Sequence, residues 1–114
     1  MTPSSLFRVT TFCLLFCGIA VYSVFGFGLA CYRQNDYVNG FIANYTTIGN
    51  RTFAPTDYVR SARWRQNNEG ACVKLCNGTI QLAATCGNSL DWAPINNTNA
   101  TKVMIYNSSI NPFC

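Results

Sequence analysis

The stretch Ala71–Cys86, A-C-V-K-L-C-N-G-T-I-Q-L-A-A-T-C, decides the fold because it predicts a β-hairpin. Asn77-Gly78 separates two short runs of alternating apolar and polar residues, and this dipeptide favours the type I′ turn, whose two central residues have positive φ. Folding the chain there sets Cys76 opposite Thr79 and Leu75 opposite Ile80. A helix is the alternative, but Asn-Gly would break it after about a turn and a half. The hairpin has one apolar face, made of Val73, Leu75, Ile80 and Leu82.

Two cysteines, Cys72 and Cys76, lie on the opposite face of this hairpin. In an extended strand their Cα atoms are roughly 13 Å apart, since each residue adds about 3.3 Å. A disulfide requires Cα atoms within about 7 Å, so the two do not bond to each other. The pattern predicts that each bonds to a different partner, and that the hairpin is cross-linked to two other parts of the chain.

Composition indicates a single small domain without enzymatic chemistry. The chain has 114 residues, 49% of them hydrophobic, with eight Lys and Arg, four Asp and Glu and no His. The net charge of +4 is too small for the many phosphate contacts of dense nucleic-acid binding. Acid–base, metal-assisted and nucleophilic catalysis mostly depend on His or on paired carboxylates. We therefore expect no cofactor and no metal site, and we interpret the scattered acidic residues as solvated or turn-forming: Asp36, Asp57, Glu69 and Asp91.

The segment Met1–Ala30 is typical of a signal peptide. A positive charge precedes the apolar stretch Phe12–Ala20, and small residues then offer cleavage after Gly26 or after Ala30. The alternative is an uncleaved anchor, because Thr11–Ala30 carries no charge and is just long enough to span a bilayer.

Residues 31–114 then form the predicted exported domain, whose five cysteines are typical of a disulfide framework. Cys-x-x-x-Cys without His does not match a structural zinc site. Because five is odd, one thiol bonds between molecules, or to a cysteine beyond Cys114 if the chain is truncated at its C-terminus. A small core leaves little margin over chain entropy, and each disulfide is expected to add about 2–4 kcal/mol. The five are Cys31, Cys72, Cys76, Cys86 and Cys114.

The same region is rich in Asn-x-Ser/Thr sequons, at which N-glycosylation occurs. Roughly two are expected by chance in a chain of this composition. An excess of sequons, together with disulfides, indicates the eukaryotic secretory route and a secreted, extracellular protein. The six sequons are at Asn44, Asn50, Asn77, Asn96, Asn99 and Asn107.

Other short stretches predict further strands and turns. Asn39-Gly40 between Tyr37-Val38 and Phe41-Ile42 predicts a second two-residue hairpin. Asp91–Pro94 is typical of a turn, and the continuously apolar Lys102–Tyr106 is typical of a strand. The predicted fold is a small β-rich, disulfide-stapled domain of antiparallel hairpins with little helix.

The polar stretch Asp57–Gly70 contains a basic cluster around a tryptophan. As a short helix it would present a patch for a sulfated glycan or an acidic partner, with the indole stacked under a guanidinium. The alternative is a solvated linker with a tethered tryptophan. The cluster is Arg60, Arg63, Trp64 and Arg65.

The motif Cys72-Val-Lys-Leu-Cys76-Asn-Gly-Thr, followed by Cys86, resembles the centre of the cysteine-rich salivary proteins of ticks. It is most similar to the eight-cysteine evasins and then to the tick basic-tail proteins. The Cys31-Tyr32 opening after the leader, the dense sequons and the Tyr106-Asn107 segment before Cys114 are similar as well.

The evasin resemblance implies a secreted, non-enzymatic immunomodulator that sequesters host chemokines by pairing its backbone with the chemokine's amino-terminal region. The matching segment would be Cys31-Tyr32-Arg33. One alternative is a basic-tail type anticoagulant that binds glycosaminoglycan or phospholipid surfaces through Arg60, Arg63, Trp64 and Arg65. Another is a structural or viral envelope-type glycoprotein that keeps its N-terminal anchor. A membrane is a partner only if the leader is uncleaved.

Overall fold

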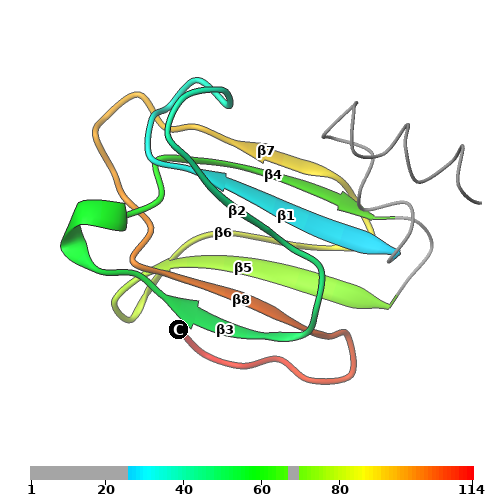
Figure 1. The fold of residues 1–114 in the computed structure, drawn as a ribbon. Coiled ribbons are helices and arrows are strands. Elements are labelled where there is room, and N and C mark those ends of the chain that lie inside the picture. Colours follow the sequence, from blue (N-terminus) through cyan, green and yellow to red (C-terminus); the bar gives the residue numbers. More distant parts are fainter. Residues whose placement is uncertain (1–25, 67–69) are drawn as a thin grey trace, which may run out of the picture.

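The structure, a computed structural model, describes residues 26–66 and 70–114 (Figure 1). Its strands pair antiparallel throughout; in the described residues one disulfide links two strands and a second links a strand to the C-terminal tail. The predicted fold class, a small β-rich and disulfide-stapled domain with little helix, is confirmed. In the described residues no helix is long and apolar enough to cross a membrane. The elements are β1 Phe27–Tyr32, β2 Phe41–Tyr45, β3 Gly49–Thr52, the 3₁₀ helix η1 Pro55–Asp57, β4 Ser61–Gln66, β5 Ala71–Asn77, β6 Ile80–Cys86, β7 Leu90–Trp92 and β8 Lys102–Asn107.

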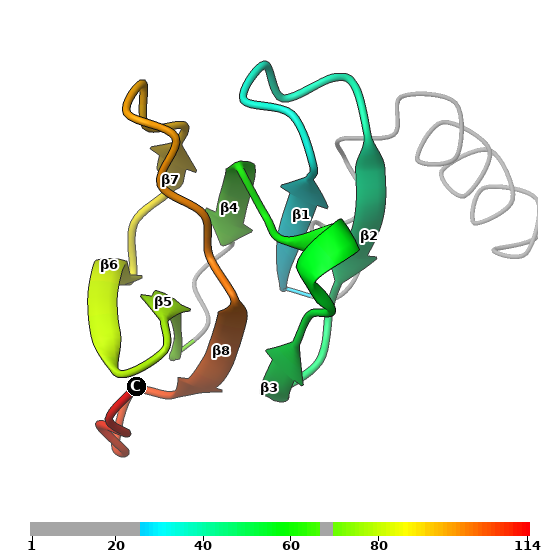
Figure 2. The ribbon, with the colours of Figure 1, turned by 90° about the vertical axis from the view of Figure 1, so that its left-hand side faces the viewer.

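The strands form two four-stranded sheets that lie as two layers (Figure 2). Sheet A has the order β2-β1-β4-β7, and sheet B has the order β3-β8-β5-β6. Side chains from both sheets meet in one buried core, including Leu29 and Trp64 from sheet A and Val73, Leu75 and Ile105 from sheet B. The molecule is therefore a β-sandwich, in which each strand directs alternate residues to the core.

Strand β8 confirms the prediction made for Lys102–Tyr106. It lies between β3 and β5, so both of its backbone edges are paired. Val103 and Ile105 face the core, while Met104 and Tyr106 are buried on the other side of sheet B. Burial on both faces explains why this strand is continuously apolar.

The β5–β6 hairpin forms as predicted, but with a different turn and register. Asn77 pairs with Ile80, so the loop is Gly78-Thr79, and only Gly78 needs positive φ (59°), as in a type II′ turn. Asn77 stays in β5 because its side-chain amide donates to the Asn99 carbonyl at 2.9 Å. The predicted pairs of Cys76 with Thr79 and of Leu75 with Ile80 are wrong.

A bulge at Leu82 completes this change of register. Leu75 pairs with Ala83 and Cys76 with Gln81, which leaves Leu82 as the extra residue in β6. Leu82 packs against the core, as predicted. Ile80 does not, because the shifted turn leaves its side chain 64% exposed.

The stretch Asp57–Gly70 is neither a short helix nor a solvated linker, because its middle part, Ser61–Gln66, forms β4, an interior strand of sheet A between β1 and β7. Its residues alternate, with Ala62 and Trp64 buried in the core and Arg63 and Arg65 half-buried between them. The alternation of small or aromatic residues with arginine is a period-two strand pattern.

The second predicted hairpin connects β1 and β2, but its loop is Arg33–Gly40 rather than Asn39-Gly40 alone. The Arg33 amide donates to the Gly40 carbonyl at 2.8 Å and closes the loop. Gly40 is required there, because its φ is +70° and a Cβ would lie 2.8 Å from the Arg33 Cβ. The Asp36 carboxylate accepts hydrogen bonds from the Val38 and Asn39 amides, as expected for a turn-forming residue.

The predicted leader falls mostly on residues outside the described ranges, and it stays a prediction. Strand β1 begins at Phe27, and Leu29 is fully buried in the core. Cleavage after Gly26 would leave β1 whole, whereas cleavage after Ala30 would remove four of its six residues. Of the two sites, the fold is compatible with the one after Gly26.

Candidate functional site

The four edge strands of the sandwich differ in how well they are protected against pairing with another chain. An edge strand presents unpaired backbone N–H and C=O groups, and natural proteins usually protect it with charge, proline, bulges or short length. Strand β7 has only three residues and carries Asp91. Strand β2 carries the Asn44 sequon, and β3 carries both Arg51 and the Asn50 sequon.

Strand β6 carries none of these charges or sequons. It has seven residues, Ile80–Cys86, with the uncharged sequence I-Q-L-A-A-T-C. Its side chains range from half-buried to exposed, and Ile80 and Ala84 are among the exposed ones. Its one protective feature is the bulge at Leu82, so the regular part of the strand is Ala83–Cys86. We call the outer backbone edge of Ile80–Cys86 the β6 edge.

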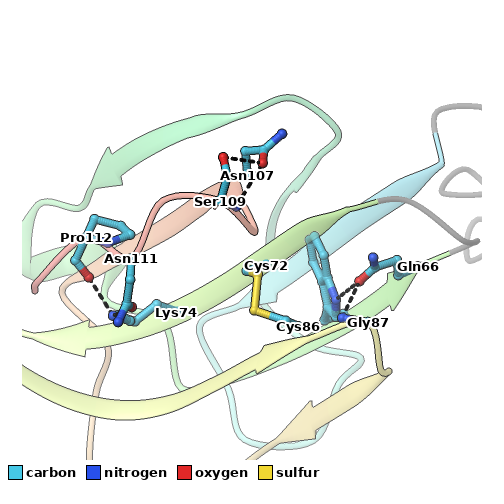
Figure 3. Close-up of a disulfide and its surroundings, with 10 residues drawn as sticks. Gln66, Cys72, Lys74, Cys86, Gly87, Asn107, Ser109, Asn111 and Pro112 are labelled. Atoms are coloured by element: carbon cyan, nitrogen blue, oxygen red, sulfur yellow. Dashed lines mark hydrogen bonds between the residues drawn. A yellow bond between two sulfur atoms is a disulfide. The ribbon is translucent and has the colours of Figure 1, made fainter.

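The β6 edge is held in place at both ends. The tight turn at Gly78-Thr79 fixes one end, and the disulfide Cys72–Cys86 ties the other end to β5, with the two Cα atoms 4.2 Å apart (Figure 3). At this end the Gly87 amide donates to the Gln66 side chain of sheet A at 3.2 Å. A partner strand would therefore meet a largely preformed template.

The C-terminal tail, Ser108–Cys114, covers the outer face of sheet B next to β6. Lys74 of β5 is only 5% exposed, because its Nζ donates to the Pro112 carbonyl at 2.5 Å and to Asn111 Oδ1 at 3.4 Å (Figure 3). The same Nζ lies 5.5 Å from the centre of the Tyr106 ring. Cys114 bonds to Cys76, and its carbonyl accepts from Lys102. These contacts run to β5 and β8 and leave the β6 edge open.

The disulfides confirm part of the prediction. Cys72 and Cys76 do not bond to each other, and each has its own partner. The expectation that both would tie the hairpin to other parts of the chain is wrong, because Cys86 belongs to the same hairpin. Only Cys76–Cys114 links the hairpin to a distant segment, the tail.

Cys31 was predicted to belong to the disulfide framework, and this is wrong for the structure: its thiol is the free one in the described part of the chain. It is fully buried in the core of sheet A, on the inward face of β1. Burial raises the pKa of the Cys31 thiol strongly, and the Arg51 charge offsets this only in part. A thiol that stays protonated and inaccessible is a poor nucleophile, so Cys31 acts as a small apolar core residue.

The segment Cys31-Tyr32-Arg33 has no free strand edge, so the structure contradicts the predicted addition of a partner strand there. Strand β1 lies between β2 and β4, and Cys31 pairs with Ala43 on one side and with Ala62 on the other. Cys31 and Tyr32 are buried, and Arg33 forms an ion pair with Asp57 at 2.7 Å. Strand addition needs a free edge, which β1 does not have.

The predicted basic patch is only partly assembled. Trp64 does not belong to it, because this side chain is fully buried, stacks on Phe27 with ring centres 5.5 Å apart and donates from Nε1 to Gln66 at 3.2 Å. Arg63 and Arg65 point to the other side of sheet A, where Asp91 lies 2.7 Å from Arg65 Nη1 and 3.8 Å from Arg63 Nε.

The remaining contacts of the arginines are with neutral groups. The Arg63 guanidinium lies over the Tyr37 ring, 4.5 Å from its centre, and Arg60 donates to Asn97 Oδ1. Arg60 Nε and Arg63 Nε are buried without hydrogen-bond partners. One carboxylate thus partly neutralises two of the three arginines, and the buried Trp64 is not available on the surface to stack under a guanidinium.

The sequons lie around the molecule but not on β6. Asn44 and Asn50 are in edge strands, and Asn77 ends β5 at the hairpin tip. In two of the other sequons the hydroxyl of the third residue donates to the asparagine Oδ1: Thr98 to Asn96 at 2.5 Å and Ser109 to Asn107 at 2.9 Å. Asn99, in the loop before β8, has a buried Oδ1 without a hydrogen-bond partner. Glycosylation of the six stays a prediction.

In the described residues no three His, Cys, Asp or Glu side chains are grouped so that they could hold a metal ion. The candidate site is therefore a surface of backbone and uncharged side chains, and the chemistry it offers is hydrogen bonding and apolar contact. The prediction from sequence missed this edge because it placed Ile80, whose side chain is exposed, in the core; the absence of charge from Ile80 to Cys86 was the available signal.

Comparisons of this chain with protein-family models, with curated proteins and with solved structures found no match.

Proposed function

We propose that this protein is a secreted, non-enzymatic binding protein that captures an extended segment of a partner protein at the β6 edge. The single observation that supports this is the state of β6: a seven-residue edge strand with no charge, no proline and no sequon, fixed by a turn and a disulfide. Each of the other three edges carries a charge or a sequon, or is short.

Strand addition supplies affinity through main-chain hydrogen bonds, and neighbouring side chains supply selectivity. At the β6 edge the neighbouring side chains are uncharged, with Ile80 and the exposed Gln81 at one end and the small Ala83, Ala84 and Thr85 along the regular part. They suit a partner segment without charges, because a charged side chain placed beside them would lose water without gaining an opposite charge.

A chemokine is the partner class that the resemblance to evasins implies, and we keep it as the proposed partner. Chemokines are mostly basic, and this chain has a net charge of +4, so long-range attraction would not steer the encounter. Binding would then depend on short-range contacts, which is the kind that the β6 edge offers. The site is β6 instead of Cys31-Tyr32-Arg33.

The test is a screen of purified chemokines against glycosylated, disulfide-bonded protein, by biolayer interferometry. We expect binding by at least one chemokine, followed in hydrogen exchange by new protection of the amides of Ile80–Cys86. A matched variant, Arg60→Ala/Arg63→Ala/Arg65→Ala, should bind as the wild type does.

Two results would count against the proposal. A screen without binding would remove chemokines as partners, and protection of β2 or β3 in place of β6 would reject the site. Loss of binding in the triple arginine variant, with salt-dependent retention on heparin, would instead support the glycosaminoglycan-binding alternative.

A further inference from the structure

We infer that a second copy of this chain covers the β6 edge when no partner is bound, and that this self-pairing regulates access to the site. The two β6 strands would pair antiparallel about a two-fold axis beside Ala84, and the two B sheets would join into one continuous sheet. The inference rests on the proposed function in one respect: it treats the β6 edge as the surface that a partner must reach.

The first argument is charge. In a two-fold symmetric pair, each residue near the axis meets its own copy, so an edge that carries a charge repels itself. Pairing through β3 would bring Arg51 towards its copy, and pairing through β7 would do the same for Asp91. Strand β6 carries no charge, so its self-pairing meets no such repulsion.

The second argument is the size of the side chains along the regular part of the strand. With the axis at Ala84, Ala84 lies opposite its own copy, and Ala83 lies opposite the second copy's Thr85. The Ala84 pair lies on one face of the sheet and the Ala83–Thr85 pairs lie on the other, and on both faces the side chains are small enough to allow close packing. The bulged residue, Leu82, lies away from the axis and does not interrupt these central pairs.

The third argument is that nothing in the described residues covers this edge, although the adjacent face of sheet B is covered. The C-terminal tail bonds to Cys76, Lys74 and Lys102, all on β5 and β8. The sequons also lie elsewhere, and the nearest along the chain, Asn77, is at the far end of the hairpin from Cys86. A second strand can therefore approach β6 along its regular part.

Self-pairing would act on the site by mass action. Each copy occupies the edge of the other, so a partner strand must displace the second copy before it binds. The apparent affinity for the partner should fall when the protein concentration rises above the dissociation constant of the dimer, because fewer free edges remain.

The test uses sedimentation equilibrium of the oxidised protein over a wide concentration series. We expect the mass of one chain at the lowest concentrations and of two chains at the highest. Ala84→Lys and Ala84→Glu should each remain monomeric, because like charges then meet at the axis. An equimolar mixture of the two variants should form the dimer again, because the charges now attract.

The matched control is Ala54→Lys, the same change at an exposed alanine outside the β6 edge, and this variant should dimerise as the wild type does. Hydrogen exchange of the wild type gives a second readout that needs no mutation, since the amides of Ala83–Cys86 should gain protection as the concentration rises. A wild-type protein that stays monomeric throughout, or a dimer that Ala84→Lys leaves unchanged, would overturn the inference.

The two proposals can fail separately. A monomeric protein whose β6 amides are protected by a chemokine would overturn the self-pairing and support the proposed function. A dimer that forms through β6, with no chemokine able to protect this strand, would support the self-pairing and overturn the proposed function.

Discussion

The two sheets of the sandwich share one core but are held together in different ways. Sheet B contains both disulfides, Cys72–Cys86 across its hairpin and Cys76–Cys114 to the tail. Sheet A has no disulfide among the described residues, and its one cysteine there, Cys31, is a buried free thiol. Outside the core, the Arg65–Asp91 ion pair links two strands of sheet A and the Arg33–Asp57 ion pair links the loop after β1 to η1, and both pairs are partly exposed.

This difference shows where covalent links are needed in so small a domain. Sheet A buries its largest side chain, Trp64, together with Leu29, and exposed ion pairs add little to that packing. Sheet B has an open β6 edge and an irregular tail, both of which would otherwise fray. The disulfides tie these two parts to β5. They stabilise the fold because they lower the entropy of the unfolded chain. The following predictions test this comparison.

The largest effect is expected from Trp64→Ala in sheet A. Removing a fully buried tryptophan leaves a cavity that the sandwich cannot close, which costs about 3–5 kcal/mol of the free energy of unfolding. Urea denaturation of the oxidised protein measures it. Arg65→Ala, one residue along β4, is the control and should cost less than about 1 kcal/mol. An equal loss of the free energy of unfolding in the two variants would mean that the stability of sheet A does not depend on the packing of Trp64.

Removing either disulfide should destabilise sheet B, and the loss in the free energy of unfolding should be larger for the disulfide that closes the longer loop. The entropy of loop closure gives about 4 kcal/mol for Cys76–Cys114, with a sequence separation of 38. It gives about 3 kcal/mol for Cys72–Cys86, with a separation of 14. The double alanine variants of each pair, compared by urea denaturation, measure both. The reverse order would show that loop length does not set the contribution.

Cys31→Ser should destabilise sheet A by about 1–3 kcal/mol, because a hydroxyl placed in this apolar site has no hydrogen-bond partner. Cys31→Val, in which the side chain stays apolar, is the control and should lose less of the free energy of unfolding. Denaturation under oxidising conditions measures both variants. In the wild type, iodoacetamide should label Cys31 only after unfolding, because burial raises the pKa of this thiol. Rapid labelling of the folded protein would contradict its burial.

The smallest effect concerns the Arg33–Gly40 loop at low pH. Hydrogen bonds from the Asn39 and Val38 amides hold the pKa of Asp36 below its usual value. A carboxyl group with a lowered folded pKa stabilises the fold above its unfolded pKa, and this contribution is lost as the pH falls through the folded pKa. An NMR titration should therefore show the Val38 and Asn39 amides shifting in acid. Asp36→Ala should abolish this titration, and an unchanged titration would exclude Asp36 as its cause.

The β5–β6 hairpin shows which features could be predicted from the sequence and which could not. The alternation on either side of Asn77-Gly78 indicated two paired strands, and the separation of Cys72 and Cys76 along an extended strand excluded a bond between them. The turn was misplaced by one residue because only Gly78 needs positive φ. That shift placed Ile80 opposite Asn77 at the tip of the hairpin, where its side chain is exposed.

The interpretation of Arg60–Arg65 failed for a different reason. A single tryptophan among arginines fits an exposed cluster as well as it fits a strand with one buried face. Trp64 is buried because it packs against Phe27 and the rest of the core, and this packing excludes the exposed cluster. No local pattern contains that information, because Phe27 lies more than thirty residues earlier in the chain.

The sequence by itself determined the class of this protein: short alternating runs, turn dipeptides and a set of cysteines in a short chain indicate a small antiparallel β-domain with disulfides. Only the tertiary structure decided which cysteine stays free, which strands are interior and which edge is open. These properties depend on how strands distant in the chain are ordered in each sheet. Local propensity and residue spacing do not specify that order, because it is set by the packing of the two sheets on one core.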